Sequence, residues 1–428
     1  TLSLHDALPI SYSIFECGDF MKISNNNPFT PGFGEIPYII AGRSDITDEY
    51  EAIIESGGKS QKRHPLIKGM RSYGKTVLLR KLLKIAEDHG YAAFYISSTS
   101  DMYDNLTTNM KEKAADISVS STFSFAPSVT FSDENTGTST TLGGISISRT
   151  SEHEPIDRTL ESLIRIMLRS KKIKGIAVAI DEINPEYVDD IQRIASTMQS
   201  LVSEKLPVSF IGAGLPEYID EIQQDPSISF IRRMSHKEIG AISFDELGKA
   251  IRRTCSDHRI GISDEAIEYI VRASDGSPYL TQVFSSVAYE HAIGKGIKKI
   301  EITANDCLES FKSALPTILT SVVKPTFQSL TCAEREFLRA MSLDDKTSPV
   351  SKIGDIAKRM GKTPQYADTY KNRLIDKRII RQDGRGLVRC SIPYMTTYLS
   401  DQAHYDSLCS PSDGTDFENR PGFWLDLV

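Results

Sequence analysis

One short stretch of this chain has the residue types and spacing of a phosphate-binding loop. Residues 69–76 read GMRSYGKT and fit the pattern GxxxxGK[ST], in which glycines let backbone N–H groups close around phosphate oxygens at a helix start. In this pattern Lys75 reaches the β and γ phosphates of ATP, and the Thr76 hydroxyl binds Mg²⁺. The alternative is a glycine-rich turn with an exposed lysine, but a predicted strand precedes this loop and a predicted helix follows it. The residues expected to contact the nucleotide here are Gly69, Met70, Arg71, Ser72, Tyr73, Gly74, Lys75, Thr76 and Val77.

Two carboxylates follow an apolar run elsewhere in the chain. Residues 176–180 read IAVAI and lead directly into Asp181 and Glu182. A buried parallel strand brings the residues at its carboxyl end to the edge of the sheet where α/β proteins bind ligands. Asp181 is then suited to hold the metal, and Glu182 to orient and deprotonate the attacking water. Alone, such a pair is equally typical of a helix N-cap; together with the glycine loop it indicates a hydrolytic centre in which Lys75 and Glu182 are catalytic.

The surrounding sequence alternates between short apolar runs and longer amphipathic segments, which predicts alternating strands and helices. Strands are predicted at 64–68, 91–97, 175–180 and 208–212, and helices at 45–56, 75–90, 101–115, 155–170, 186–203 and from Pro216. This alternation indicates an α/β fold with a parallel sheet covered on both faces. Residues 117–151, rich in Ser, Thr and Gly, are predicted to be an inserted hairpin or loop. From about residue 244 the chain is predicted to be helical, at 245–256, 263–274, 278–293 and 303–314.

The C-terminal part differs in pattern and charge. Helices are predicted at 333–342, 352–360 and 364–377, the last with Thr363 as cap and proline at its first position, and short strands at 379–382 and 387–391 flank a glycine turn. Three helices and a hairpin predict a winged helix. Over residues 351–390 Lys and Arg exceed Asp by seven, although the chain carries a net charge of −7.

This basic module is a candidate for binding double-stranded DNA, although winged helices also serve as protein-contact modules. Side chains on its third helix are expected to face base edges, namely Gln365, Thr369 and Asn372. Basic side chains are expected to contact phosphates, namely Lys362, Lys371, Arg373 and Arg385.

Composition limits the other function classes. The length of 428 residues predicts several domains, and 39% hydrophobic with 25% charged residues is typical of a globular protein. No apolar run approaches the roughly 20 residues that cross a bilayer, which favours a cytoplasmic protein. The six cysteines are scattered and form no CxxC pair, so no zinc site is predicted. Residues 1–20 begin with TLSLHDALPI, which resembles a translated sequencing adapter, so they are predicted to be an artefact or a disordered leader; a short native extension is the alternative.

With these motifs in order, residues 27 to about 399 resemble the AAA-type P-loop ATPases of the origin-recognition and STAND-like groups. Gly42-Arg43 resembles the family's GR box near the adenine, residues 206–216 its sensor-1 strand, and Gly276-Ser277-Pro278 the lid turn whose proline packs on the nucleotide. The resemblance implies a P-loop NTPase sheet core, a helical lid and a C-terminal winged-helix domain. The corresponding domains are 21–60 (arm and adenine-side helix), 61–240 (ATPase core), 241–315 (lid), 316–405 (winged helix) and 406–428 (tail).

Two departures from the family pattern matter. The end of the sensor-1 strand, near Ala213 and Gly214, has no Asn, Thr or Ser, and no sensor-2 arginine stands beside Gly276. These absences imply that hydrolysis is slow or that a neighbouring molecule completes the hydrolytic site. Arg232 and Arg233 stand where related proteins carry an arginine that completes a neighbour's site; an ordinary solvated basic pair is the alternative.

The resulting hypothesis is an ATP-hydrolysing switch that moves its lid and acts on DNA or a protein partner through the winged helix. The rival is a DNA-binding regulator whose nucleotide site is structural and does not turn over. A third hypothesis is a homo-oligomeric scaffold in which Arg232 or Arg233 reaches the neighbouring protomer.

Overall fold

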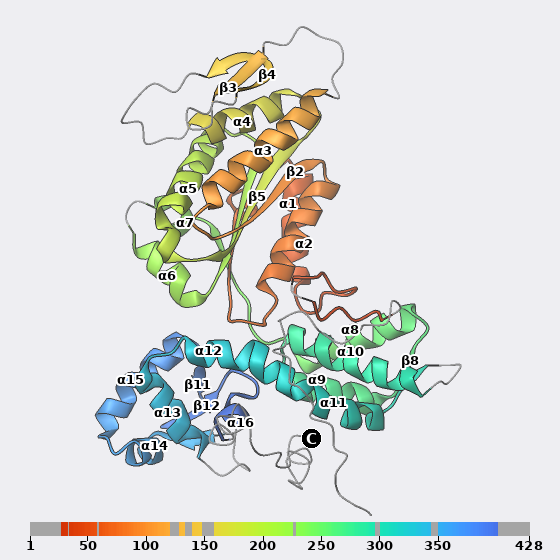
Figure 1. The fold of residues 1–428 in the computed structure, drawn as a ribbon. Coiled ribbons are helices and arrows are strands. Elements are labelled where there is room, and N and C mark those ends of the chain that lie inside the picture. The colour runs from red at the N-terminus through yellow and green to blue at the C-terminus, as the bar shows by residue number, and fades with distance from the viewer. Residues whose placement is uncertain are drawn as a thin grey trace, which may run out of the picture.

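The computed structural model describes residues 27–32, 34–57, 60–119, 128–132, 139–147, 158–225, 228–295, 300–343 and 350–400. Figure 1 shows an upper lobe built around a sheet and a lower lobe made mostly of helices. The leader and the tail predicted from the sequence lie outside these residues.

The upper lobe contains a five-stranded parallel sheet. Its strands are β1 (Pro65–Lys68), β2 (Tyr91–Ser97), β5 (Gly175–Ile183), β6 (Val208–Gly214) and β7 (Ser235–Glu238), in the order β2-β5-β6-β1-β7. Every residue of β5 except Glu182 is buried, as expected of a central strand covered on both faces. The α/β fold class with a parallel sheet is therefore confirmed.

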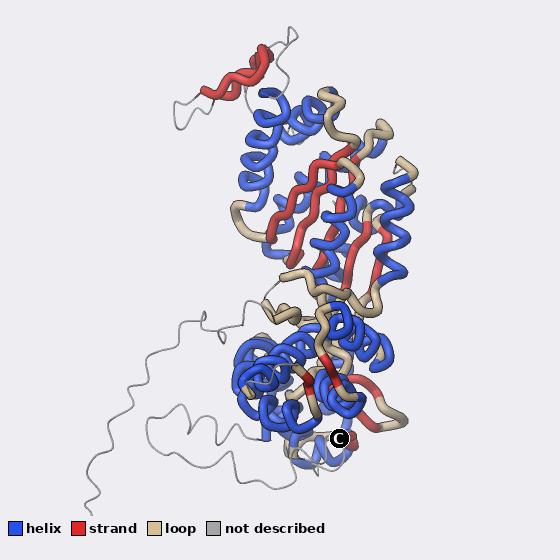
Figure 2. Tube along the Cα trace, turned by 90° about the vertical axis from the view of Figure 1, so that its right-hand side faces the viewer, coloured by secondary structure: helices blue, strands red, loops and turns tan. Residues whose placement is uncertain are grey.

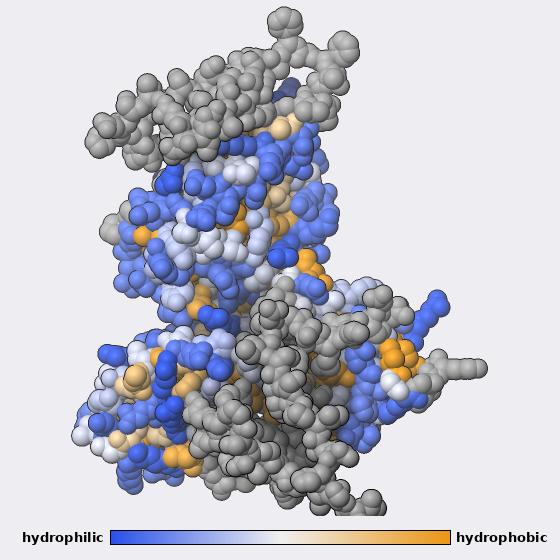
Figure 3. Space-filling view, viewed as in Figure 1, coloured by the Kyte–Doolittle hydropathy of each residue, from blue (hydrophilic) through white to orange (hydrophobic). Residues whose placement is uncertain are grey.

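Helices cover both faces of this sheet (Figures 1 and 2). One face carries α1 (Ser44–Glu55) and α2 (Lys75–Asp88); the other carries α3 (Met102–Val119), α4 (Arg158–Arg169), α5 (Val188–Ser203), α6 (Pro216–Gln224) and α7 (Ser229–Arg232). Because side chains alternate along a strand, Ala177 and Ala179 of β5 pack with α1 and α2, whereas Val178 packs with α3 to α5. Figure 3 shows mostly hydrophilic side chains over the described part of this lobe.

A lid of four helices lies below the sheet. It comprises α8 (Phe244–Asp257), α9 (Asp264–Ser274), α10 (Pro278–Gly294) and α11 (Ala304–Ile318), with the short parallel strands β8 (Gly261–Ile262) and β9 (Glu301–Ile302). Apolar residues surround α10, and most of its side chains are buried, so it forms the centre of the lid core.

The C-terminal domain follows directly from the lid through η3 (Leu319–Val323) and α12 (Lys324–Gln328). It contains α13 (Cys332–Ser342), α14 (Ile353–Arg359), α15 (Pro364–Asp376) and α16 (Met395–Ser400). Its antiparallel sheet has the order β10-β12-β11, from Val350–Lys352, Leu387–Cys390 and Ile380–Gln382. Thr331 and Thr363 cap α13 and α15, and Gly384 and Gly386 take positive φ in the turn between β11 and β12.

Several elements differ from their predicted bounds. The helix predicted to start at Lys352 starts at Ile353, because residues 350–352 form strand β10 against β12. Strand β7 and helix α7 were not predicted; β7 reads SHKE, has no apolar residue and pairs with β1 through its backbone. The insertion contains β3 (Ser128–Ser132) and β4 (Ser139–Ile147), an antiparallel pair; the remainder of 120–157 lies outside the described residues.

No helix within the described ranges is both long enough and apolar enough to cross a membrane.

Candidate nucleotide site

The loop at residues 69–74 connects β1 to α2 and has a backbone that requires its two glycines. Gly74 has φ +83° and caps α2, a conformation that costs any L-residue with a side chain. A Cβ atom at Gly69 would lie 2.6 Å from a carbon of Ile239. The glycines therefore let the backbone turn tightly beneath the N-terminus of α2.

The backbone N–H groups of this loop are available to an anion. Within the described part of the chain, none of the N–H groups from Arg71 to Val77 donates to a protein acceptor. Several successive N–H groups at a helix start form a site of positive potential. The loop thus presents the donor set that phosphate oxygens require.

Lys75 is the first residue of α2 and is half-buried. Its Nζ donates to the carbonyl oxygen of Met70 at 2.9 Å. Burial lowers the pKa of the Lys75 amine to about 8, although the nearby Asp181 carboxylate acts in the opposite direction. An amine in this environment is poorly solvated, which strengthens its attraction to a phosphate.

The acidic pair at the end of β5 has two distinct environments. Asp181 is only 2% exposed and accepts hydrogen bonds from the Tyr95 hydroxyl (3.0 Å) and from the backbone N–H of Glu182 (2.9 Å). Glu182 has φ +55°, is exposed and lines the cavity above the loop. The N-cap alternative does not apply, because Asn184 caps the short helix that follows. Asp181 is held rigidly while Glu182 faces the open space.

These residues border a cavity of about 220 Å³ between the sheet lobe and the lid. The loop contributes residues 71–77, and the lid contributes Pro278 and the apolar side chains of Ile242, Leu247 and Ile251. Ser277 at the lid turn donates its hydroxyl to the Ser72 carbonyl at 3.1 Å, so lid and loop are in direct contact. One end of the cavity is therefore polar and the other apolar, as a nucleotide requires.

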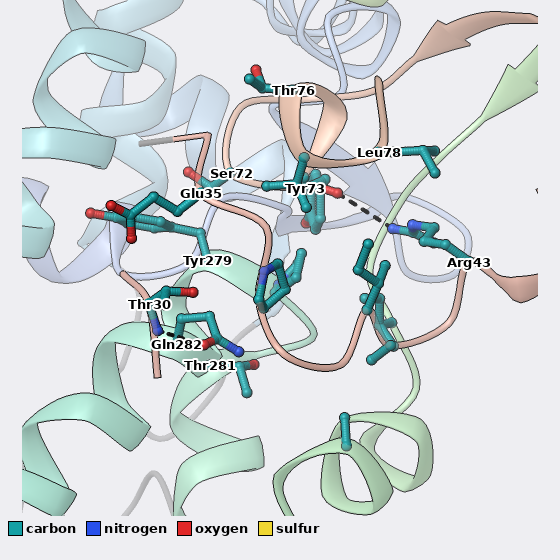
Figure 4. Close-up of a pocket in the computed structure, with 18 of the residues that line it drawn as sticks. Thr30, Glu35, Arg43, Ser72, Tyr73, Thr76, Leu78, Tyr279, Thr281 and Gln282 are labelled. Atoms are coloured by element: carbon teal, nitrogen blue, oxygen red, sulfur yellow. Dashed lines mark hydrogen bonds between the residues drawn. The ribbon is translucent and has the colours of Figure 1, made fainter. Parts of the chain in front are cut away.

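Arg43 forms one wall of this cavity and is held by the backbone. Its Nη2 atom donates to the carbonyl oxygens of Gly240 (2.6 Å) and Tyr73 (3.5 Å), and Figure 4 shows the side chain directed at the latter. Burial lowers the pKa of the Arg43 guanidinium. Gly42 takes φ +60° beside Ile242 and does not itself line the cavity. Arg43 thus ties the segment that precedes α1 to the glycine loop.

The N-terminal arm contributes cavity residues that sequence analysis missed. Phe29, Thr30, Gly34 and Glu35 all line the cavity. The backbone N–H of Thr30 donates to Oε1 of Gln282 on α10 at 3.1 Å, and Figure 4 shows these two residues facing each other. Gly34 passes so close to α2 that a Cβ there would lie 3.0 Å from Thr76 Cγ2. The Pro- and Gly-rich composition of the arm indicated only an irregular segment.

Sequence analysis also did not single out Glu217, at the start of α6 after β6. The Gly214 carbonyl of that strand accepts from the Gly69 N–H at 3.4 Å, so α6 begins next to the phosphate loop. Burial raises the pKa of Glu217, and the charges of Lys377, Lys75 and Arg71 act against this rise. Its Oε2 atom is buried and has no hydrogen-bond partner in the described part of the protein. A polar side chain therefore does stand near this strand end, three residues beyond the expected position.

Other predicted residues lie apart from the cavity. Gly69, Met70 and Asp181 shape it from behind without lining it. Arg232 and Arg233, at the end of α7, are exposed and do not line it.

The predicted DNA-contacting residues gather on the C-terminal domain. Gln365, Thr369, Asn372 and Arg373 are exposed along α15 at helical spacing. Arg385 is exposed in the turn between β11 and β12, whereas Lys371 is ion-paired with Asp368 at 2.6 Å. Lys362 lies 5.6 Å from the ring centre of Tyr366.

A five-stranded parallel sheet with a glycine loop after β1, an acidic pair after β5 and a helical lid defines the fold of the AAA-type P-loop ATPases. Solved structures with this fold match the chain at low identity. The Walker-type ATPase PABY2304 of Pyrococcus abyssi is 15% identical with a TM-score of 0.55, and the alignment covers 84% of this chain and 96% of that one. The Aeropyrum pernix ORC2 protein, in ADPNP–ADP complexes, is 13% identical with a TM-score of 0.56, covering 89% and 98%.

A weaker structural match is the Thermotoga maritima RuvB Holliday junction branch migration motor, at 15% identity, TM-score 0.39, and coverage of 87% and 96%. Residues 320–399 match a family described as a domain of unknown function, DUF8462. No curated protein matches the sequence.

Proposed function

We propose that this protein binds ATP with Mg²⁺ in the cavity between sheet and lid, and hydrolyses it. The observation that carries the proposal is the set of unpaired N–H groups at residues 71–77, which share one cavity with Lys75 and Glu182. ORC2, which has this fold, is described in complexes with ADPNP and ADP, and this supports a nucleotide as the ligand.

Each side chain has a separate role in the proposed reaction. Lys75 leaves the Met70 carbonyl and pairs with the β and γ phosphates, and the loop N–H groups hold their oxygens. Thr76 at the cavity and Asp181 just behind its lining would hold Mg²⁺, which would supply positive charge to neutralise the phosphates. Glu182 orients the attacking water and accepts its proton. Arg43 and Pro278, which line the cavity, border the base and ribose, and Gly42 shapes the segment that carries Arg43.

Two substitutions test this proposal. Lys75→Ala removes the phosphate partner and is expected to abolish saturable nucleotide binding, whereas Glu182→Gln keeps the shape of the site and is expected to preserve binding while reducing turnover at least about 100-fold. Lys84→Ala is the matched control, because Lys84 is an exposed residue of the same helix, paired with Asp88 at 2.9 Å. Wild-type ATPase activity in both site variants would exclude this assignment.

We further propose that the C-terminal domain is a winged helix that binds double-stranded DNA and that the nucleotide controls this binding. The exposed face of α15, with Gln365, Thr369 and Asn372, supports base contacts, and the excess of basic residues supports phosphate contacts. Arg373→Ala and Arg385→Ala are each expected to weaken binding to all duplex sequences and to reduce the salt dependence by about one ion.

The rival function, a DNA-binding regulator with a structural nucleotide site, makes a different prediction. It requires the same duplex affinity with and without ATP, so a titration under both conditions distinguishes the two functions. The homo-oligomeric alternative places Arg232 or Arg233 in a neighbour's cavity. It predicts a larger particle with a non-hydrolysable ATP analogue in size-exclusion chromatography, and a monomer under those conditions counts against it.

A further inference from the structure

Two residues of the phosphate loop are anchored in the C-terminal domain. Met70 and Tyr73 are 6% and 9% exposed. Both belong to the apolar cluster of that domain, which also contains Val323, Phe327 and Ile392. Two of the four variable positions of the loop are therefore part of a second domain's core.

Polar contacts join the same surfaces. The Tyr73 hydroxyl donates to the carbonyl oxygen of Ser391 at 3.3 Å. Nearby, Arg378 of the C-terminal domain is ion-paired with Glu238 at the end of β7. The Tyr394 hydroxyl donates to the Ala273 carbonyl of the lid at 2.6 Å. The domain is thus attached to the loop, to the sheet lobe and to the lid at once.

The anchoring acts directly on the groups that face the cavity. The carbonyl of Met70, whose side chain is buried in the C-terminal domain, accepts the Lys75 ammonium. Tyr73 stands between Ser72 and Gly74, which have φ of +67° and +83°. A non-glycine residue such as Ser72 is held in this region only where its surroundings impose it. The docked domain and the lid supply that restraint.

We propose that Tyr73 is a positioning residue through which the docked C-terminal domain sets the nucleotide affinity of the phosphate loop. A loop held in its binding conformation before the ligand arrives loses less entropy on binding, so docking raises affinity. By linkage, bound nucleotide strengthens docking to the same extent. This inference rests on the proposed nucleotide binding and adds its control by the C-terminal domain.

The first experiment measures the Kd of the full chain for labelled ADP in the presence of Mg²⁺. Tyr73→Ala removes the anchor and is expected to weaken binding about five- to tenfold, the effect of freeing one ordered side chain and its loop. Tyr73→Phe keeps the ring and loses only a long hydrogen bond, so about a two- to threefold effect is expected. This near-rescue by phenylalanine separates anchoring from gross misfolding.

The second experiment loosens docking away from the cavity, since neither Arg378 nor Glu238 lines it. Arg378→Glu and Glu238→Arg each place like charges together and are expected to weaken nucleotide binding about threefold, while the double swap restores it. Lys358→Glu is the control, because it makes the same charge change on exposed α14 of the same domain. Hydrogen exchange of β12 is expected to slow on adding MgADP in wild type, and much less in Tyr73→Ala.

The outcomes separate the two proposals. Absence of binding by folded wild-type protein overturns the nucleotide site itself. If Tyr73→Ala and both single charge variants bind nucleotide as tightly as the wild type does, the positioning role is overturned and the nucleotide site is left intact.

Discussion

The buried amine of Lys75 makes nucleotide affinity depend on pH in a range where an ordinary lysine does not titrate. Burial lowers its pKa to about 8 in the protein without nucleotide. The charged amine is the form that pairs with phosphate, so raising the pH removes the binding form. Affinity is expected to be highest below pH 8 and to fall as the pH rises above it.

The size of the effect follows from the fraction of charged amine. With a pKa of about 8, roughly nine-tenths of Lys75 is charged at pH 7 and roughly one-tenth at pH 9, so the affinity falls about tenfold between these values, or about 1.4 kcal/mol. A lysine with the usual pKa of about 10.4 would change the affinity by only a few per cent over the same range.

The assay is a fluorescence titration with labelled ADP at constant free Mg²⁺ and ionic strength, from pH 7 to pH 9. Lys75→Arg is the control, because its guanidinium stays charged from pH 7 to pH 9. Every other titrating group, including those of the nucleotide, is the same in this variant and in the wild type. The arginine variant is expected to bind more weakly but with little pH dependence. An identical pH profile for wild type and Lys75→Arg would refute the assigned environment of Lys75.

Three substitutions test other parts of the structure by thermal or urea unfolding. Burial raises the pKa of Glu217 above its value in the unfolded chain, so the charged carboxylate destabilises the fold above about pH 4.5. Glu217→Gln should therefore raise the Tm at pH 7. This gain in Tm should vanish as the pH falls to 4. Gly74→Ala places a side chain at φ +83° and should cost about 1–2 kcal/mol and weaken nucleotide binding. Burial opposes ionisation of Asp306, but Lys295, Thr303 and His291 hold its pKa below the usual range. Its stabilising contribution is present above pH 3.8 and is lost as the pH falls further, so Asp306→Asn should cost about 2–4 kcal/mol at pH 7 and less in acid.

Local sequence signals predicted the bounds of several elements. Strand β2 has the bounds predicted for it, 91–97, because an apolar run between a helix-ending glycine and a polar segment has one favourable structure. Helix α15 starts where Thr363 and Pro364 place it, since capping depends on adjacent residues. Each of these signals is contained within a few residues of sequence.

The contacts that the sequence did not predict join distant segments. The Thr30–Gln282 hydrogen bond links residues 252 positions apart, and the Tyr73–Ser391 bond links residues 318 apart. A polar strand such as β7 becomes a strand only because β1 offers its backbone. The pairing of β6 with β1 brings Glu217 near enough to Lys75 for their charges to interact, which no local pattern encodes.

The long-range contacts also change how the phosphate motif is understood. Its fixed residues, Gly74, Lys75 and Thr76, face the cavity, and they are the residues from which the motif was identified. The motif does not specify the residues at positions 70 and 73, and here Met70 and Tyr73 pack in the C-terminal domain, while Tyr73 also lines the cavity. A change in that domain's position therefore reaches the phosphate site through the side chains of Met70 and Tyr73.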